Sequence, residues 1–575
     1  MKLTSKRRSR WQGGYALLLV MAFIAAGLLT MGGVLSWSSN TSANIERNNQ
    51  YYRTMAAAEA GTEKVLAQMA RDFQKSGQKE VTDNLSAYRD LTPAGSEAAY
   101  WSNYVYRDNS GVSNKVTVTE VRSEVYTNLQ SQYTGLQGYL SQYELISSAS
   151  EIDSLYRIPV GIKQEVQTCS IPIFQFAIFY GIDMELNPGR DMNVWGRVHS
   201  NRMLYTVPDG STLTYWGNVT SVSNILIGPH PLDPNQSRAG TVVFKKAHDS
   251  KVPTLNLPVR TDVTTITPAE MHKIIELPNV GDDPQLTKEK LYNKADLIIL
   301  VGNSGETAEA VTYSAGVATR TAVGWTNVEA FVTTTNCFKD NREEAWEKVV
   351  DIDVGALKTW VNTNAAIVAA LGNTNKVHTL YVADTRTYSG GNTTNPAVRL
   401  VNGRYLPTNG LTVVTQNPIY VKGDYNAPTL NTNWTGDTQP AAILADAVNI
   451  QSRLWSDAHS TDALAGRDPA ETTINAATLG GIVETYSGHY SGGCENFLRL
   501  HENWNGKNLW YNGSIVMLFP SQKALGTWGK SGVYSVPTRK WAYDTNFNDP
   551  NKLPPNTPMV RTIIRGSWSV VAGGS

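Results

Sequence analysis

The sequence predicts a mainly β protein in which one long N-terminal helix precedes a β-rich body with the character of a parallel β-helix and an α+β insertion. Three observations predict this fold class: an uncharged run between Arg10 and Glu46, a composition rich in Trp, Tyr, Gly and small polar residues, and the repeat W-G-x-V-x-S. Aromatic residues and Thr favour strands, and a repeat of short strands favours stacked coils.

The chain opens with a basic leader, residues 1–14, which is followed by the apolar run that starts at Tyr15. About 20 apolar residues at 1.5 Å each span a bilayer core, and the apolar part of a secretory signal is shorter. We therefore expect a single-pass helix with its N-terminus in the cytoplasm, because a positive flank stays on that side. The flank consists of Lys2, Lys6, Arg7, Arg8 and Arg10. The anchor residues are Ala16, Leu17, Leu18, Leu19, Val20, Phe23, Ile24, Leu28 and Leu29.

The same helix is expected to continue beyond the membrane as a stalk, so that residues 15–80 form one unit. Apolar side chains recur there at spacings of three, four and seven, from Ile45 to Phe73, and mark one helix face. Good helix formers dominate the segment and no Pro interrupts it before Lys75. The Gly in "KSGQK", residues 75–79, is the kind of residue that ends a helix.

The leader, the apolar helix from Tyr15 and "MAAAEAGTEKVLAQM" resemble the N-terminal module of type IV pilus assembly proteins of the PilX kind. The resemblance implies that prepilin peptidase cuts after Gly14 and leaves Tyr15 as the new N-terminus. Many pilins carry Glu at the fifth mature position, whereas this chain has Leu19. That departure fits a minor or initiating subunit better than a shaft subunit. Segments such as "WGRVHSNRMLY" and "PIYVKGDYN" resemble large uncharacterised domains on PilX-type stalks, which implies a bacterial cell-surface location.

Composition restricts the class of partner. The chain of 575 residues has 50 basic and 50 acidic side chains, so it lacks the basic excess of a nucleic-acid-binding protein, and we expect no nucleic-acid partner. Cys169, Cys337 and Cys494 are far apart in sequence, which allows one disulfide without indicating the pair. No short ligand spacing accompanies them, so we expect no metal site.

After a connecting α/β region at 81–155, the first part of the β-rich body is expected at 156–263. "WGRVHS" begins at Trp195 and "WGNVTS" at Trp216. Short strands that repeat in this way suggest coils of a parallel β-helix, although a hairpin repeat in a sandwich would look similar. The second part of the body is expected at 372–575, where short apolar runs end in Gly, Asn or Ser.

Residues 264–371 are expected to form the α+β insertion. Thr267 followed by Pro268 and then Glu270 predicts a helix start. The stretch "ADLIILVGNSGETAEAVTYS" predicts two strands around a Gly turn, and "DVGALKTWVNTNAAIVAAL" predicts a helix broken near Asn362.

Candidate chemistry is sparse. "VGNSGE" lacks the spacing of a nucleophile elbow, and "DTNFNDPN" departs from a calcium loop. His501, Glu502 and Trp504 are the candidate binding residues, because together they could line a sugar-binding groove. We expect no catalytic residue, no cofactor and no enzymatic activity.

Two function classes follow. The first is a non-enzymatic minor pilin-like subunit of a type IV pilus or pseudopilus, which anchors a large surface domain and acts in initiation, tip display or adhesion. Its partners would be other pilins, the assembly machinery and, before assembly, the inner membrane, with the body periplasmic or at the cell surface. The second is a membrane-anchored protein that binds or cleaves a surface glycan, for which paired carboxylates would be diagnostic.

The processing hypothesis predicts a defined mature N-terminus. In a host with prepilin peptidase, the chain should begin at Tyr15, whereas the uncut leader should remain in a host that lacks the enzyme. Intact-mass measurement of the purified chain distinguishes the two forms. An N-terminus near Asn44 in both hosts would instead indicate an ordinary secretory signal.

Overall fold

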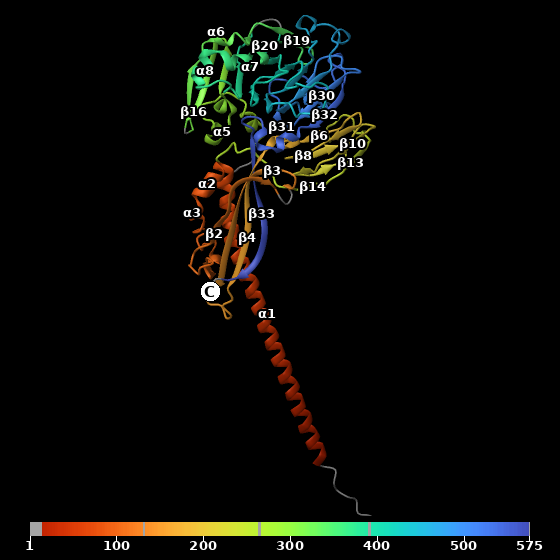
Figure 1. The fold of residues 1–575 in the computed structure, drawn as a ribbon. Coiled ribbons are helices and arrows are strands. Elements are labelled where there is room, and N and C mark those ends of the chain that lie inside the picture. Colours follow the sequence, from red (N-terminus) through yellow and green to blue (C-terminus); the bar gives the residue numbers. More distant parts are fainter. Residues whose placement is uncertain (1–13, 130–132, 263–265, 315, 389–392, 574–575) are drawn as a thin grey trace, which may run out of the picture.

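The computed structural model describes residues 14–129, 133–262, 266–314, 316–388 and 393–573. Helix α1 (Gly14–Ser76) projects from a small sheet domain, and a large strand-rich body lies at the far end of that sheet (Figure 1). A long N-terminal helix followed by a strand-rich body is the predicted fold class, which the structure confirms. Short helices α2 (Gln78–Asp83) and α3 (Leu85–Tyr88) follow the stalk.

The sheet domain is antiparallel and is completed by the two ends of the chain. β1 and β2 pair with one edge of β3, β4 pairs with the other, and the last strand, β33, pairs with β4. The strands are β1 (Tyr104–Arg107), β2 (Thr117–Asn128), β3 (Gln137–Glu151), β4 (Val160–Pro172) and β33 (Met559–Ala572). The whole body is therefore inserted between β4 and β33.

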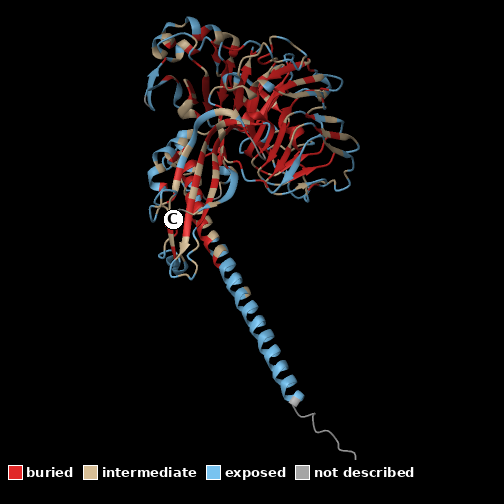
Figure 2. Ribbon diagram, turned by 60° about the horizontal axis from the view of Figure 1, so that its bottom comes forward, coloured by how far each residue is buried: buried red, intermediate tan, exposed pale blue. Residues whose placement is uncertain are grey.

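The C-terminal half of α1 packs closely on this sheet, while the N-terminal half is exposed (Figure 2). Small residues allow the close approach: Ala57 and Ala58 are buried, and a Cβ on Gly61 would lie 2.2 Å from Ser147 Oγ. Further along the helix, Val65, Leu66, Met69 and Phe73 form a core with Tyr143, Leu145 and Val166. The "AAAEAG" stretch is thus the contact between helix and sheet.

Strand β33 also holds the end of α1 through polar contacts. Arg561 Nη1 donates to Phe73 O at 3.2 Å and to Gln74 O at 3.0 Å, and the Gln74 side chain donates back to Arg561 O at 2.8 Å. Arg565 forms an ion pair with Glu63, almost three turns earlier in the helix. These bonds satisfy carbonyl groups at a helix C-terminus, where a cation is also favoured.

The body is a stack of parallel coils whose strands form three faces. One face is a twelve-stranded sheet: β14 (His248–Ser250), β11 (Val219–Ser221), β8 (Arg197–Ser200), β5 (Phe176–Tyr180), β31 (Ile515–Pro520), β28 (Ala477–Ile482), β25 (Ala441–Leu444), β23 (Leu411–Val414), β21 (Thr379–Asp384), β15 (Leu297–Gly302), β16 (Gly305–Ser314) and β17 (Val317–Ala322). All neighbours from β14 to β15 are parallel, and β16 and β17 add an antiparallel hairpin at one end.

The other two faces are each divided into two sheets. The second face contains β12 (Ile225–Leu226), β9 (Leu204–Thr206) and β6 (Met184–Leu186), and separately β18 (Val332–Thr333), β20 (Ala345–Asp353), β22 (Thr394–Val401), β24 (Ile419–Lys422), β26 (Val448–Gln451) and β29 (Leu498–Leu500), with β19 (Cys337–Asp340) beside β20. The third face contains β13 (Thr241–Phe244), β10 (Thr212–Tyr215) and β7 (Met192–Val194), and separately β27 (Thr472–Asn475), β30 (Asn508–Gly513) and β32 (Thr538–Tyr543).

The order of strands along the first face shows that two chain segments build one stack. The N-terminal segment proceeds outward from β5 to β14, the chain then crosses to the opposite end at β15, and the C-terminal segment returns to β31. There β31 pairs in parallel with β5, and Ile515, Ile178 and Val198 continue one apolar row across the junction. We call this junction the seam. The first face continues through it, and the other two faces are interrupted there.

The two copies of W-G-x-V-x-S occupy equivalent positions in neighbouring coils. Val198 pairs with Val219 and Ser200 with Ser221. The indole rings of Trp195 and Trp216 stack outside the coils, with centroids 4.6 Å apart and planes 10° apart. The spacing of the repeat therefore corresponds to one coil.

Residues 264–371 do not form a separate insertion as expected. Their strands β15 and β20 belong to the first and second faces of the stack, and pair with β21 and β22. The helices α5 (Pro284–Glu289), α6 (Trp325–Val328), α7 (Val354–Thr363) and α8 (Ala365–Leu371) lie around this end of the stack, whereas α4 (Pro268–His272) packs against β31. The predicted capping of α4 by Thr267 and Glu270 is present.

The expected boundaries at residues 155 and 372 also differ from the observed arrangement. Residue 155 lies between β3 and β4 of one sheet, and the segment 372–575 contributes β33 to that same sheet. The first difference arises because β3 and β4 pair across residue 155. The second arises because β33 pairs with β4 almost 400 residues earlier in the chain, and such a pairing leaves no mark on local composition or periodicity.

The contact at Gly61 predicts a loss of stability on substitution. Gly61→Ala should lower the free energy of unfolding by about 1–3 kcal/mol, because the added Cβ overlaps Ser147. Helix propensity alone predicts the opposite sign. Thermal unfolding of the detergent-solubilised chain measures the change.

Two variants test the cause. Gly27→Ala adds a Cβ where nothing lies within 4 Å, so it should leave the unfolding temperature unchanged. Ser147→Gly should restore stability to the Gly61→Ala chain by removing the overlapping side chain. An unfolding temperature for Gly61→Ala at or above that of the wild type would contradict the close contact.

Candidate functional site

The exposed half of α1 is the first candidate site. Among the described residues, α1 is the one helix long and apolar enough to cross a membrane, and its most apolar stretch makes no contact that buries it. All nine predicted anchor residues, from Ala16 to Leu29, are exposed, with Leu29 at 78%. An apolar surface of this extent needs lipid or other helices to cover it.

The predicted processing site lies at the start of this helix. Gly14 is the first described residue and Tyr15 is 74% exposed. The basic flank from Lys2 to Arg10 falls outside the described residues. A cut after Gly14 therefore stays a prediction.

The structure places His501, Glu502 and Trp504 together, but inside the body, where their exposed fractions are 1%, 1% and 0%. This corrects the expectation of a surface groove, because a glycan outside the coils cannot reach these side chains. The Leu-x-Leu pattern before His501 belongs to β29, which pairs with β26 and whose three residues are all buried.

His501 and Glu502 make hydrogen bonds inside the body instead. His501 Nε2 lies 3.0 Å from Asn449 Oδ1, and burial lowers the pKa of the imidazole to about 4, which leaves it neutral at pH 7. Glu502 accepts hydrogen bonds from Ser452 N at 2.6 Å and from Ser452 Oγ at 2.7 Å. Burial raises the pKa of this carboxyl to about 7, and the two bonds oppose that rise.

A second candidate site lies on the third face of the body, at the seam. β7 pairs with β10 and β32 pairs with β30, and no pairing between β7 and β32 occurs in the described strands. The open edges of β7 and β32 flank a cleft of about 340 Å³. We call it the seam cleft and define it by Arg190, Asn193, Trp195, Arg539, Lys540 and Trp541.

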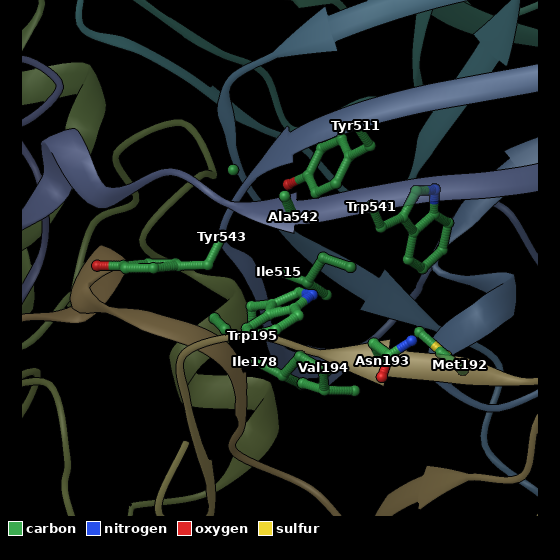
Figure 3. Close-up of a pocket in the computed structure, with 12 residues that line it drawn as sticks. Ile178, Met192, Asn193, Val194, Trp195, Tyr511, Ile515, Trp541, Ala542 and Tyr543 are labelled. Atoms are coloured by element: carbon green, nitrogen blue, oxygen red, sulfur yellow. The ribbon is translucent and has the colours of Figure 1, made fainter. Parts of the chain in front are cut away.

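Below its mouth, the cleft reaches an apolar floor formed by the two chain segments. Ile178 and Val194 come from the N-terminal segment, and Tyr511 and Ile515 come from the C-terminal segment. Figure 3 shows Trp195 beside this floor and Trp541 on the strand that carries Ala542 and Tyr543. The floor continues the main core of the body, so it is rigid and excludes water.

The walls carry flat aromatic and polar groups. Trp195 is 48% exposed, and Trp216 covers one side of it while donating from Nε1 to Asn193 Oδ1 at 2.9 Å. Trp541 lies beneath Arg539, whose Cζ is 5.4 Å from the ring centroid. The Trp541 Nε1 group is buried and has no hydrogen-bond partner in the described structure. The cleft therefore offers the exposed indole of Trp195 beside cationic side chains, a lining suited to a ligand with apolar and polar sides.

Sequence reasoning missed this site in part. The W-G-x-V-x-S repeat marked Trp195 and Trp216, whereas Arg539, Lys540 and Trp541 carried no motif. Only the seam brings residues more than 300 positions apart into one cleft.

The remaining candidate groups form no further site. Within the described residues no group of three or more His, Cys, Asp or Glu side chains is placed to hold a metal ion. Cys169, Cys337 and Cys494 are free, so none forms the disulfide that the sequence allowed. Cys169 and Cys494 are buried, and burial raises the pKa of both thiols.

Comparison with known proteins identifies no family. No protein-family model matches the chain, and a search of curated proteins finds no significant match. Among solved structures, the crystal structure of the competence-associated pilin ComZ from Thermus thermophilus aligns with a TM-score of 0.26 and 10% identity, covering 91% of this chain and 98% of that one. A likeness of this degree carries no argument about fold or function.

The environment of Glu502 predicts a pH dependence of stability. Its pKa is raised in the folded state, so the native protein binds the extra proton between the unfolded value of about 4.3 and about 7. The contribution of this residue to stability should therefore fall as pH rises through that window. Glu502→Gln, which removes the titration, should flatten the decline in unfolding temperature measured from pH 4.5 to 8.

Glu306→Gln is the matched control, because Glu306 lies exposed at the turn between β15 and β16. It should reproduce the pH profile of the wild type. A Glu502→Gln profile that is parallel to the wild type across the whole range would show that Glu502 does not titrate in this window.

Proposed function

We propose that this protein is a minor pilin-like subunit that anchors a large surface body, first in the inner membrane and then at the tip or base of a type IV filament. The observation that carries the proposal is the division of α1. Its N-terminal half is apolar and uncovered, and small and apolar side chains of its C-terminal half pack against an antiparallel sheet.

The uncovered half is suited to both environments that the proposal requires. No charged residue lies between Tyr15 and Asn44, so lipid can cover the helix before assembly. In a filament, the same surface can pack against equivalent helices of other subunits, which replaces lipid contacts by van der Waals contacts between helices. Other pilins and the assembly machinery are therefore the proposed partners.

The position of the body favours an end of the filament over its shaft. The body leaves the sheet at Pro172 and returns at Met559, and Arg561 contacts the C-terminal end of α1. The body thus extends beyond that end of the helix, away from the uncovered half (Figure 1). A subunit stacked above it along the filament would have to occupy the same space. Leu19, where many pilins carry Glu, also removes a charged contact with a neighbouring N-terminus.

We further propose that the body is a parallel β-helix without enzymatic activity, exposed outside the inner membrane. Its parallel coils and one-coil repeat support the architecture. Two buried acidic residues of the body have structural roles. Asp446 is fully buried and accepts hydrogen bonds from Ser521, Gln522 and Lys523, and Glu502 is held by Ser452.

The filament role predicts a specific neighbour of α1. In cells with an active pilus system, Leu29→Cys in a Cys337→Ser background should cross-link to another pilin through a maleimide–benzophenone reagent, whose maleimide bonds to the Cys thiol and whose photoactivated ketone inserts into a C–H bond of the neighbour. Leu29 is 78% exposed, and the two remaining native cysteines are buried. Mass spectrometry of the cross-linked band identifies the partner.

Val280→Cys in the same background is the control, because Val280 is fully exposed on the body, away from α1. It should give no pilin adduct. Leu29→Cys should also give none in cells without prepilin peptidase, although the chain stays in the membrane. Absence of any pilin adduct in piliated cells, with the chain confined to the membrane, would overturn the filament role.

A further inference from the structure

We propose that the seam cleft binds an anionic saccharide, a sugar chain whose residues carry carboxylates. This inference concerns the body alone and does not depend on the filament role. The cleft combines three features that this ligand class needs: exposed indole faces, an excess of cationic side chains, and unpaired backbone groups. Each comes from described residues on the two sides of the seam.

The indole faces provide a platform for sugar rings. The rings of Trp195 and Trp216 stack face to face on successive coils, with planes 10° apart, so Trp216 covers one face of Trp195 and leaves the opposite face for a ligand in the cleft that Trp195 lines. Both are substantially exposed, at 48% and 38%. Exposure of two stacked Trp side chains costs free energy in water and is unusual unless a partner covers them. A pyranose ring has an apolar face of matching size.

The charged side chains of the cleft favour a ligand with negative charge. Arg190, Arg539 and Lys540 line it, against the single acidic residue Asp191. Asp191 already accepts a hydrogen bond from Thr212 N at 2.8 Å, and Arg539 Nη2 donates to Glu495 O at 3.2 Å. Among the described residues, Arg190 and Lys540 form no ion pair, so they are the cations left for a ligand. Lys245 adds another cation 5.5 Å from the Trp216 ring centroid. These cations favour carboxylate groups, and Arg can bind a carboxylate through two parallel hydrogen bonds.

The remaining polar groups suit hydroxyls. The facing edges of β7 and β32 leave main-chain N–H and C=O groups without partners among the described strands. Such groups can donate to and accept from the same hydroxyl. A peptide strand added to this edge is the competing occupant. β7 offers a peptide only three residues to pair with and β32 offers six, whereas the exposed Trp195 ring and the cations between them suit a sugar ring that carries a carboxylate.

Binding of defined oligosaccharides to the detergent-solubilised full chain tests the proposal. Oligogalacturonate and oligomannuronate are the anionic probes, maltoheptaose is the neutral probe, and oligoglutamate is the anionic peptide probe. Isothermal titration should detect the two uronate probes, with affinity that falls as salt increases. Maltoheptaose should bind at least about tenfold more weakly, because it lacks the ion pairs.

Two variants assign the contacts. Trp195→Ala should weaken uronate binding by about tenfold or more through loss of the stacking face, with an unchanged unfolding temperature because the ring lies outside the coils. Arg190→Ala combined with Lys540→Ala should remove the preference for uronate over maltoheptaose. Trp568→Ala is the matched control, because Trp568 is 44% exposed on β33 of the small sheet, and it should bind like the wild type.

Three results would overturn the proposal. The first is failure of both uronate probes to bind the folded wild-type chain. The second is binding that Trp195→Ala leaves unchanged. The third is equal or tighter binding of oligoglutamate, which would indicate a peptide site or a surface that recognises charge alone.

Discussion

The antiparallel pairing of β4 with β33 is the constraint on which the rest of the molecule depends. Pro172 pairs with Met559, so the chain enters and leaves the body at adjacent points although almost 400 residues lie between them. The same two strands complete the sheet on which α1 packs, and Arg561 holds the end of that helix. Helix, sheet and body are therefore coupled: separating β33 from β4 would expose the helix contact and release one end of the body together.

This constraint explains the unusual order of the coils. A stack that ran simply from its first coil to its last would place entry and exit at opposite ends. Here the entry and exit points must both lie beside the small sheet. The chain therefore starts in the middle of the stack at β5, proceeds outward to β14, crosses to the opposite end and returns to β31. The first face stays continuous because β31 and β5 pair. On the third face the incoming strand β7 and the outgoing strand β32 do not pair with each other, and the seam cleft lies between them.

One helix serves two environments because its sequence changes character near Glu46. Before that residue the side chains are uncharged and all around apolar or small, which suits lipid or a helical bundle; after it, only one face is apolar. Ala57, Ala58 and Gly61 bring the helix backbone close to β3, where larger side chains would separate helix from sheet. A pilin-like subunit that holds a surface body needs both halves of this helix. The uncharged half allows assembly with other helices, and the half that packs on the sheet fixes the position of the body relative to the helix.

The sequence by itself determined the elements with local signals. The uncharged run up to Glu46 predicted the long helix, Thr267 and Glu270 predicted the cap of α4, and the two W-G-x-V-x-S copies predicted equivalent strands one coil apart. Charge, helix periodicity, capping and a short repeat all act over a few residues or one coil, so they can be read directly from the chain. Only the tertiary structure decided that β33 completes the N-terminal sheet, that residues 264–371 belong to the stack, that His501 and Glu502 are interior, and that Trp195 meets Trp541 across the seam. Each of these depends on pairing between distant strands, whose partners are chosen by the free energy of the whole fold and not by any local pattern.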